Sequence, residues 1–206
     1  MDIFGKNILV TGGTGFIGSN VAIALAKLGA KVTVCSKRQK PLYYTGLAEC
    51  ARIIHADLLN ADHCRKATEG MDCIVHAGAV SFGAKFIEKN PLVLINDNTI
   101  INVQLLAAAF ENSVKKFVYY GSSTAYPDTS RPVKEQEMFD GDPFDKYFSA
   151  GWMKRYTEIL MRVYAEKQRV MDCVSLRLSN VYGPRDKFDP ESSHVLPSLI
   201  KKFCEK

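Results

Sequence analysis

The 206-residue sequence lacks several features that would place it outside the ordinary globular proteins. No apolar stretch is long enough to cross a membrane, and the N-terminus shows no signal-peptide pattern. The six cysteines include no C-x-x-C spacing, and the four histidines form no metal-ligand motif. We therefore expect a cytoplasmic protein with reduced thiols, no membrane partner and no bound metal.

A strong excess of charge of one sign is also absent. The net charge of +5 is mild and the basic residues are dispersed, so the sequence does not favour a nucleic-acid partner. Apolar residues make up 47% and charged residues 24%, which is typical of a soluble globular protein. The length suits one α/β domain with a sizeable core.

The most informative segment is a glycine-rich turn that follows the apolar run Ile8-Leu9-Val10 and opens a helix-like stretch. Its glycines satisfy the pattern G-x-G-x-x-G in the strand–turn–helix context that dinucleotide-binding sites need. Unpaired N–H groups and the helix dipole favour an anion at such a helix start, and glycines let a pyrophosphate approach the backbone. The cradle predicted for the cofactor phosphates comprises Gly12, Gly13, Thr14, Gly15, Phe16, Ile17 and Gly18.

Strand-like and helix-like segments alternate along the whole chain. The predicted strands, mostly apolar as strands covered on both faces should be, are 7–11, 31–35, 52–56, 73–77, 116–121 and 172–178. The predicted helices are 16–28, 61–69, 91–113, 144–168 and 194–204. This alternation predicts a doubly wound parallel sheet of the Rossmann type. Residues 127–143, with three prolines, are predicted to form a long loop near the site.

In such sheets the ligand lies beyond the carboxyl ends of the strands, and the second strand ends in Ser36-Lys37-Arg38. A site that selects NAD usually places an acidic residue there, but no Asp or Glu lies between Asp2 and Glu49. Charge and hydrogen bonds from these three side chains would suit a 2′-phosphate. The sequence therefore favours NADP as the cofactor, with NAD as the alternative.

The next strand ends also carry candidate cofactor contacts. Asp57-Leu58 follows the third strand, where a carboxylate can accept a hydrogen bond from an adenine amino group. Ala77-Gly78 follows the fourth strand, where small residues allow the backbone to lie close to the cofactor. After the fifth strand, the hydroxyl side chains of 122–124 are expected to face the nicotinamide.

As a set, these segments resemble the extended short-chain dehydrogenases/reductases of the nucleotide-sugar epimerase and dehydratase type. The matching segments are 11–18, Asp57-Leu58, Gly121-Ser122-Ser123 through Tyr126, and Asn180-Val181-Tyr182-Gly183-Pro184. Within that family, residues 121–127 and the segment from Asn180 through Arg185-Asp186 to His194 and Pro197 most resemble the GDP-L-fucose synthase group. The resemblance implies a GDP-sugar substrate with hydride transfer at C4.

The resemblance also implies roles for particular residues. Ser122 matches the catalytic hydroxyl, and Lys154 matches the lysine that lowers the pKa of a catalytic tyrosine and holds the nicotinamide ribose. Asn98 resembles an active-site asparagine, although a residue on the helix surface would read the same way. Thr124 and His194 occupy the positions of a Cys and a His that move protons during epimerisation. Ser122, Ser123, Asn180 and His194 are the expected substrate contacts.

The catalytic tyrosine is where the sequence departs from the family, and two registers are possible. Taking Tyr147 as the tyrosine places Gly151 at the lysine position, four residues on. Taking Lys154 as the lysine places Ala150 at the tyrosine position and keeps the family's downstream glutamate at Glu158. We prefer the second register. Ala150 would then be either an engineered substitution or the residue of a natural inactive relative, so this chain is expected to be impaired.

Two wider expectations follow from the resemblance. Residues 1–180 would form the dinucleotide-binding domain and 181–206 would begin a truncated substrate-binding portion. Family members pair through the helices that correspond to 91–113 and 144–168, which predicts a homodimer. The alternative to an NAD(P)-dependent enzyme is a non-catalytic dinucleotide-binding module that senses redox state or acts as a scaffold. The retained Ser122, Asn98 and Lys154 favour the enzyme.

Overall fold

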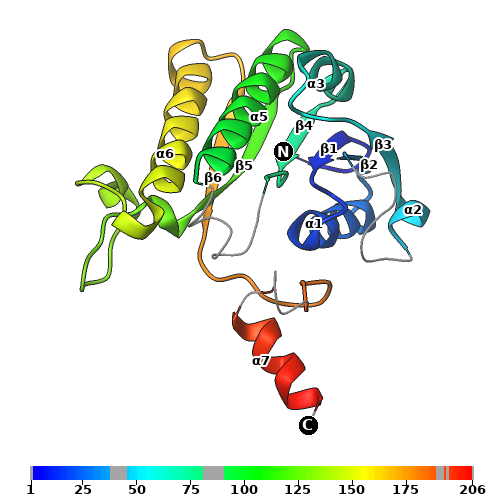
Figure 1. The fold of residues 1–206 in the computed structure, drawn as a ribbon. Helices are drawn as coiled ribbons and strands as arrows, with labels where there is room; N and C mark the ends of the chain where they lie inside the picture. Colours follow the sequence, from blue (N-terminus) through cyan, green and yellow to red (C-terminus); the bar gives the residue numbers. More distant parts are fainter. Residues whose placement is uncertain (1, 38–45, 81–90, 189–192, 194, 206) are drawn as a thin grey trace.

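The computed structural model describes residues 2–37, 46–80, 91–188, 193 and 195–205, which form an α/β fold around one parallel sheet (Figure 1). The strands are β1 (Asn7–Thr11), β2 (Lys31–Ser36), β3 (Ala51–His55), β4 (Cys73–His76), β5 (Lys116–Ser122) and β6 (Asp172–Leu178). All pair in parallel in the order β3-β2-β1-β4-β5-β6. This confirms the predicted doubly wound sheet. The strand order reverses between β1 and β4, where such folds bind their ligands.

The helices match the predicted ones with local differences. They are α1 (Phe16–Lys27), α2 (Leu47–Cys50), α3 (Ala61–Thr68), α5 (Pro91–Glu111), α6 (Phe148–Arg162) and α7 (Val195–Cys204). The short α2 was not predicted. The helix predicted at 144–168 is a 3₁₀ turn (Asp145–Tyr147), then α6, then a π-helical turn (Val163–Lys167). Short 3₁₀ helices also cover Ser123–Ala125 and Glu135–Phe139, the latter inside the predicted loop.

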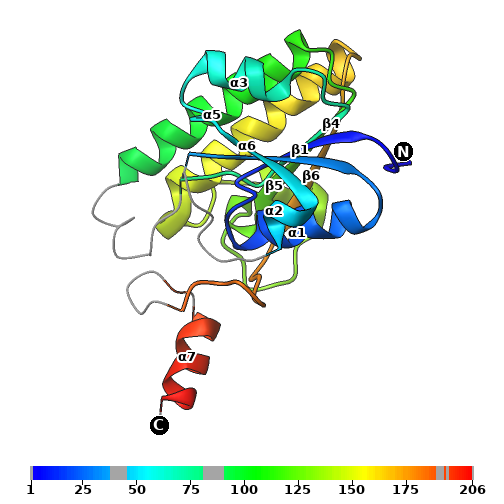
Figure 2. The ribbon, with the colours of Figure 1, turned by 90° about the vertical axis from the view of Figure 1, so that its right-hand side faces the viewer.

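Helices cover the sheet on both sides (Figures 1 and 2). Alternate residues of β1 separate the two layers: Leu9 packs in the core under α3, α5 and α6, while Ile8 and Val10 pack with α1. The central strands are therefore buried on both faces, as predicted. The edge strand β6 differs, because Val174 and Leu176 on alternate positions stay exposed.

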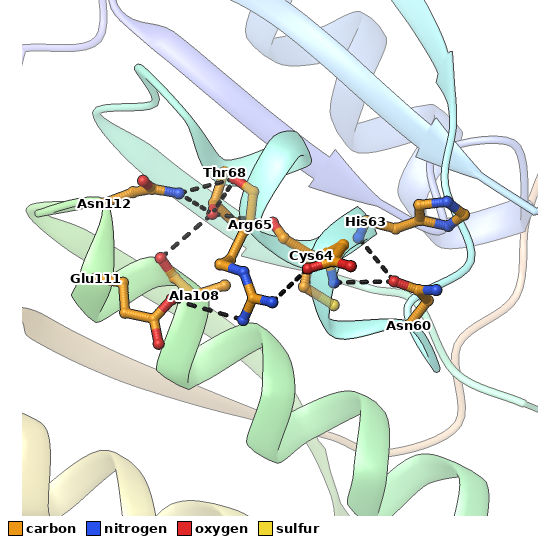
Figure 3. Close-up of polar contacts among 9 residues, drawn as sticks. Asn60, His63, Cys64, Arg65, Thr68, Ala108, Glu111 and Asn112 are labelled. Carbon is orange, nitrogen blue, oxygen red and sulfur yellow. Dashed lines mark hydrogen bonds and ion pairs between the residues drawn. The ribbon is translucent and has the colours of Figure 1, made fainter.

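Helix α3 is fixed at its start and at its end (Figure 3). The side chain of Asn60 accepts hydrogen bonds from two backbone N–H groups of the first turn, so Asn60 is the N-cap residue. At the other end, the Thr68 hydroxyl contacts the Ala108 carbonyl on α5, and the Asn112 amide donates to Thr68 at 2.7 Å. These contacts hold α3 on α5 and thereby fix the turn after β3 that carries Asp57.

The C-terminal helix α7 stands away from the sheet in both views (Figures 1 and 2). Several apolar side chains on it are exposed, namely Val195, Leu196, Leu199, Ile200 and Phe203. None of the helices in the described part of the chain has the length and apolar character that a membrane span requires.

Candidate active site

The glycine turn after β1 is a point where backbones meet too closely for side chains. Gly12 adopts φ +63°, and a Cβ built on it would lie 2.6 Å from the Cα of Gly78 at the end of β4. A Cβ on Gly18 would lie 2.4 Å from the Gly12 carbonyl oxygen, and one on Gly13 would lie 2.7 Å from Val34. These three positions can therefore hold only glycine in this geometry.

The start of α1 fits an anion. Gly15 is the N-cap residue, its N–H donates to the Gly12 carbonyl at 2.9 Å, and no side chain caps the helix. The first N–H groups of a helix have no partner within it, so those of Phe16 and Ile17 point out of the turn. The helix dipole favours negative charge at the same place. The turn thus has the geometry expected of a pyrophosphate cradle.

The residues expected at the adenosine end lie beside this turn. The hydroxyls of Thr14 and Ser36 are buried and 2.9 Å apart. Lys37 is 68% exposed and forms an ion pair with Asp57 at 2.9 Å, so the structure brings the predicted 2′-phosphate and adenine contacts together. Burial favours a higher pKa for Asp57, but hydrogen bonds from Lys37 and from the Leu59 backbone, with the charge of Lys37, lower it. Arg38 lies outside the described residues.

Two further predicted residues have mainly structural contacts. Leu58 is buried in the core with α3 and α5, so its side chain faces away from the turn. Asn98 on α5 is buried rather than on the helix surface: its amide oxygen accepts from the Val80 N–H at 2.8 Å, and its amide nitrogen donates to the Val80 carbonyl at 3.0 Å. Asn98 therefore fixes the segment that contains Ala77 and Gly78.

The end of β5 carries a pair of hydroxyl groups. Ser122 Oγ accepts hydrogen bonds from the Thr124 backbone N–H at 3.2 Å and from the Thr124 hydroxyl at 3.0 Å. These two bonds occupy the lone pairs of the serine oxygen and leave its O–H as a donor. The structure thus joins the predicted catalytic hydroxyl to the residue at the Cys position. Ser123 next to them is exposed.

Lys154 reaches the same place from α6. Its Nζ donates to the Tyr120 carbonyl at 2.8 Å, two residues before Ser122, and lies 4.7 Å from the centre of the Tyr119 ring. Burial lowers the pKa of Lys154 from 10.5 to about 8, although the carboxylate of Glu158 opposes the change. The ammonium group remains the main form at pH 7.

The packing at Gly151 bears on the choice of register. A Cβ on Gly151 would lie 2.4 Å from Pro143 and 2.6 Å from the Thr124 carbonyl oxygen, so a lysine would not fit there. Ala150 precedes this contact and lies one helical turn from Lys154, on the same face of α6. Tyr147 lies before the first residue of α6 and is about two turns from Lys154. The geometry thus agrees with Lys154 as the family lysine.

The segment after β6 is held against α1. The Asn20 amide donates to the Pro184 carbonyl at 3.1 Å, and the Arg185 guanidinium donates to the Asn20 amide oxygen at 2.6 Å. Asn180, a predicted substrate contact, is exposed between β6 and this clamp. His194 lies outside the described residues.

Sequence reasoning missed two arginines that fix the loop beside the site. Arg155 is fully buried and donates to the carbonyl of Ala125 at 2.7 Å and to that of Gly141 at 2.6 Å. Arg177 pairs with the buried carboxylate of Glu158 at 2.7 Å and also donates to the Tyr126 hydroxyl at 2.9 Å. The sequence signal that could have pointed to them is that each is a charged residue within a helix or strand whose other residues pack on the core.

Fold and site together define a dinucleotide-binding α/β protein. Comparison with known families gives the same answer more narrowly, because the chain matches the NAD dependent epimerase/dehydratase family over residues 8–206. The chain therefore belongs to this family, as the sequence motifs predicted.

Individual relatives of the chain carry the names of nucleotide-sugar enzymes. It is 34% identical to GDP-mannose 3,5-epimerase 1 of Oryza sativa subsp. japonica over 182 residues, 86% of this chain and 47% of the relative. It is 29% identical to a GDP-L-fucose synthase of Sinorhizobium fredii, over 98% of this chain and 60% of the relative. The fold matches a GDP-mannoheptose C4 reductase from Campylobacter jejuni, solved with NADP bound, with a TM-score of 0.80 and 26% identity, over 98% of this chain and 56% of that one. The chain thus spans about half to three fifths of these relatives.

Proposed function

We propose that this chain is the dinucleotide-binding part of an NAD(P)-dependent nucleotide-sugar oxidoreductase or epimerase that acts at C4 of a GDP-sugar. The observation that carries the proposal is the position of Lys154, whose Nζ lies 2.8 Å from the Tyr120 carbonyl, beside Ser122 and on the sheet edge that bears the glycine turn. A protein that only binds a dinucleotide has no need of this pair. The names of the relatives support a GDP-linked substrate. In this proposal, residues 1–180 are the dinucleotide-binding domain and 181–206 belong to the substrate-binding portion.

The residues present fit the cofactor. Glycine at 12 and 18 leaves open the space that a Cβ would fill, so a pyrophosphate has room beside the turn. The start of α1 has no side-chain cap, so its first N–H groups are available as donors. Ser36, Lys37 and the neighbouring Arg38 supply the charge and donors for a 2′-phosphate, so NADP is favoured over NAD. Bound there, the nicotinamide supplies or accepts the hydride.

The remaining chemistry belongs to side chains of the chain. The free O–H of Ser122 donates to the C4 oxygen of the sugar and polarises it. Lys154 binds the nicotinamide ribose, and its charge would lower the pKa of a tyrosine placed at 150. Ala150 has no proton to transfer, so this step is impaired in the chain. Thr124 stands at the position of a thiol and is a weaker acid. Because epimerisation would need Thr124 and His194 to move protons, this replacement favours reduction at C4 over epimerisation.

Restoring the missing proton donor is the direct test. The variant Ala150→Tyr is expected to raise hydride transfer from NADPH to a GDP-4-keto-6-deoxyhexose by about 10²–10⁴-fold, the usual contribution of a general acid or base. Its affinity for NADPH should stay close to that of the parent, because the phosphate contacts come from other residues. The assay follows the loss of NADPH absorbance, with this chain and with the longest product of its gene as the enzyme.

The variant Ala150→Phe is the matched control, since it adds the ring without the hydroxyl and should give no gain. If Ala150→Tyr also gives none while Tyr147→Phe abolishes the residual activity, Tyr147 is the acid/base and the preferred register is wrong.

A second function is supported by Ala150 itself. A chain without the proton-transfer group could serve as a dinucleotide-binding module that senses redox state or acts as a scaffold. That function is supported if Ala150→Tyr produces no turnover and Tyr147→Phe changes nothing, while NADPH binding is retained.

Cofactor preference follows from the end of β2. Replacing Lys37 with Ala removes a cation expected at the 2′-phosphate, and should weaken NADPH binding about 5–10-fold, which is about 1.0–1.4 kcal/mol, with little effect on NADH. Titration of protein and cofactor fluorescence measures both constants. Lys31→Ala, at the other end of the same strand, is the control and should change neither. Tighter binding of NADH than NADPH by the parent chain would contradict the assignment.

We also propose a homodimer formed through α5 and α6. Their outer faces carry exposed apolar side chains at helical spacing, namely Ile100, Val103 and Phe110 on α5 and Phe148, Trp152, Tyr156 and Ile159 on α6. Sedimentation at micromolar concentration should show a dimer, and Ile159→Glu should convert it to a monomer because it places a charge within the stripe. Lys66→Glu on α3 is the control. A monomeric parent chain would refute this assembly.

A further inference from the structure

A line of buried polar side chains crosses the core from the end of β1 to α6. The Thr11 hydroxyl lies 2.6 Å from Nδ1 of His76, whose Nε2 lies 2.8 Å from the amide oxygen of Asn102 on α5. The Asn102 amide nitrogen lies 2.8 Å from the Thr157 hydroxyl, which donates to the Met153 carbonyl at 3.0 Å. Four of these side chains, all but that of Met153, are nearly inaccessible to water.

The line has one direction that satisfies its donors. Thr11 Oγ1 already accepts from the Gly78 N–H at 3.0 Å, and its own hydrogen finds its acceptor at Nδ1 of His76. His76 must then carry its hydrogen on Nε2 and donate it to the Asn102 oxygen, which leaves the Asn102 nitrogen to donate to Thr157. The opposite direction would leave the buried Thr11 hydrogen without an acceptor among these groups, which is costly.

His76 is neutral in this arrangement. It is 1% exposed, and burial lowers its pKa from 6.5 to about 4, with the positive charge of Lys154 adding to the effect and the hydrogen bond to Asn102 opposing it. On α6, Lys154 and Glu158 carry charges of opposite sign that act on each other, while the buried guanidinium of Arg155 binds the carbonyls of Ala125 and Gly141. An imidazolium would place a second buried cation near Lys154, so the neutral ring favours the ammonium form of the lysine.

The line ends on both sides of Lys154. Met153 and Thr157, which it engages, flank Lys154 on α6 within one turn. The amide of Asn102 also lies 3.4 Å from the hydroxyl of Tyr119, and the ring of Tyr119 lies 4.7 Å from Lys154 Nζ. At the other end, the Thr11 hydroxyl accepts a hydrogen bond from the backbone N–H of Gly78, which packs against Gly12 in the cradle. One set of hydrogen bonds thus joins the cradle to the helix that bears the lysine.

We propose that His76 is a positioning residue for Lys154: as the neutral Nε2–H tautomer, held between Thr11 and Asn102, it ties α6 to the dinucleotide cradle and fixes the lysine at the end of β5. The role assigned to Lys154 rests on the proposed function, but the coupling itself is a property of the chain without ligand. His76 touches no reacting group, so it acts only through Asn102 and α6.

The test removes a hydrogen bond at the Thr11 end of the line and measures the pKa of Lys154. Thr11→Val keeps the shape of the side chain and removes the hydroxyl, so α6 should loosen and water should reach Lys154. The pKa of Lys154, taken from the pH titration of its side-chain NMR signal assigned with Lys154→Arg, should rise from about 8 toward 10.5. Thr11→Ser keeps the hydroxyl and should leave the pKa near 8.

A second measurement needs no variant. The ¹⁵N signals of the His76 ring should report hydrogen on Nε2 and none on Nδ1 between about pH 5 and 8, where an ordinary histidine titrates. If Thr11→Val does not fold, Thr157→Val against Thr157→Ser applies the same test from the other end.

Two results would overturn the proposal. One is a ring with hydrogen on Nδ1. The other is a Lys154 pKa that stays near 8 in a folded Thr11→Val or Thr157→Val protein of reduced stability, which would mean that the line serves only the fold. Both measurements are made without dinucleotide, so failure to bind NADPH would refute the proposed function and leave this result standing.

Discussion

The contact of three backbone segments at Gly12 is the constraint on which the site depends. The turn after β1, the end of β4 at Gly78 and the start of α1 at Gly18 approach so closely that a methyl group on Gly12 or Gly18 would collide with backbone. The same contact exposes the first N–H groups of α1 and places Thr11 where it can bind both Gly78 and His76. The cradle and the buried polar line therefore share one origin.

The second half of the site is built by α6 against β5. Gly151 lets the helix pack on Thr124, Lys154 binds the Tyr120 carbonyl, and Arg155 holds the loop that follows. Together these contacts fix the first half of α6 relative to the strand end, and none of them involves the side chain of residue 150. An alanine there is compatible with the fold, because alanine is the best helix former.

Much of this could be read from the sequence, because the signals are local. Apolar runs predicted the strands, and apolar residues at helical spacing predicted the helices. The spacing of Gly13, Gly15 and Gly18 predicted the cradle. The hydrogen bond between Asn98 and Val80 and the ion pair of Lys37 with Asp57 could not be predicted from the sequence, because each joins residues about 20 positions apart in the chain. The direction of the line through His76 depends on partners from four elements, and a lone histidine in an apolar strand gives no hint of them.

In the function proposed for this chain, the glycine turn and the end of β2 bind the phosphates of a dinucleotide. A crystal structure of the chain grown with NADPH tests it most directly. We expect the pyrophosphate on the first N–H groups of α1, the 2′-phosphate beside Ser36 and Lys37, and the nicotinamide ribose within hydrogen-bond reach of Lys154. A cofactor bound elsewhere, or a turn that stays empty at saturating NADPH, would contradict it.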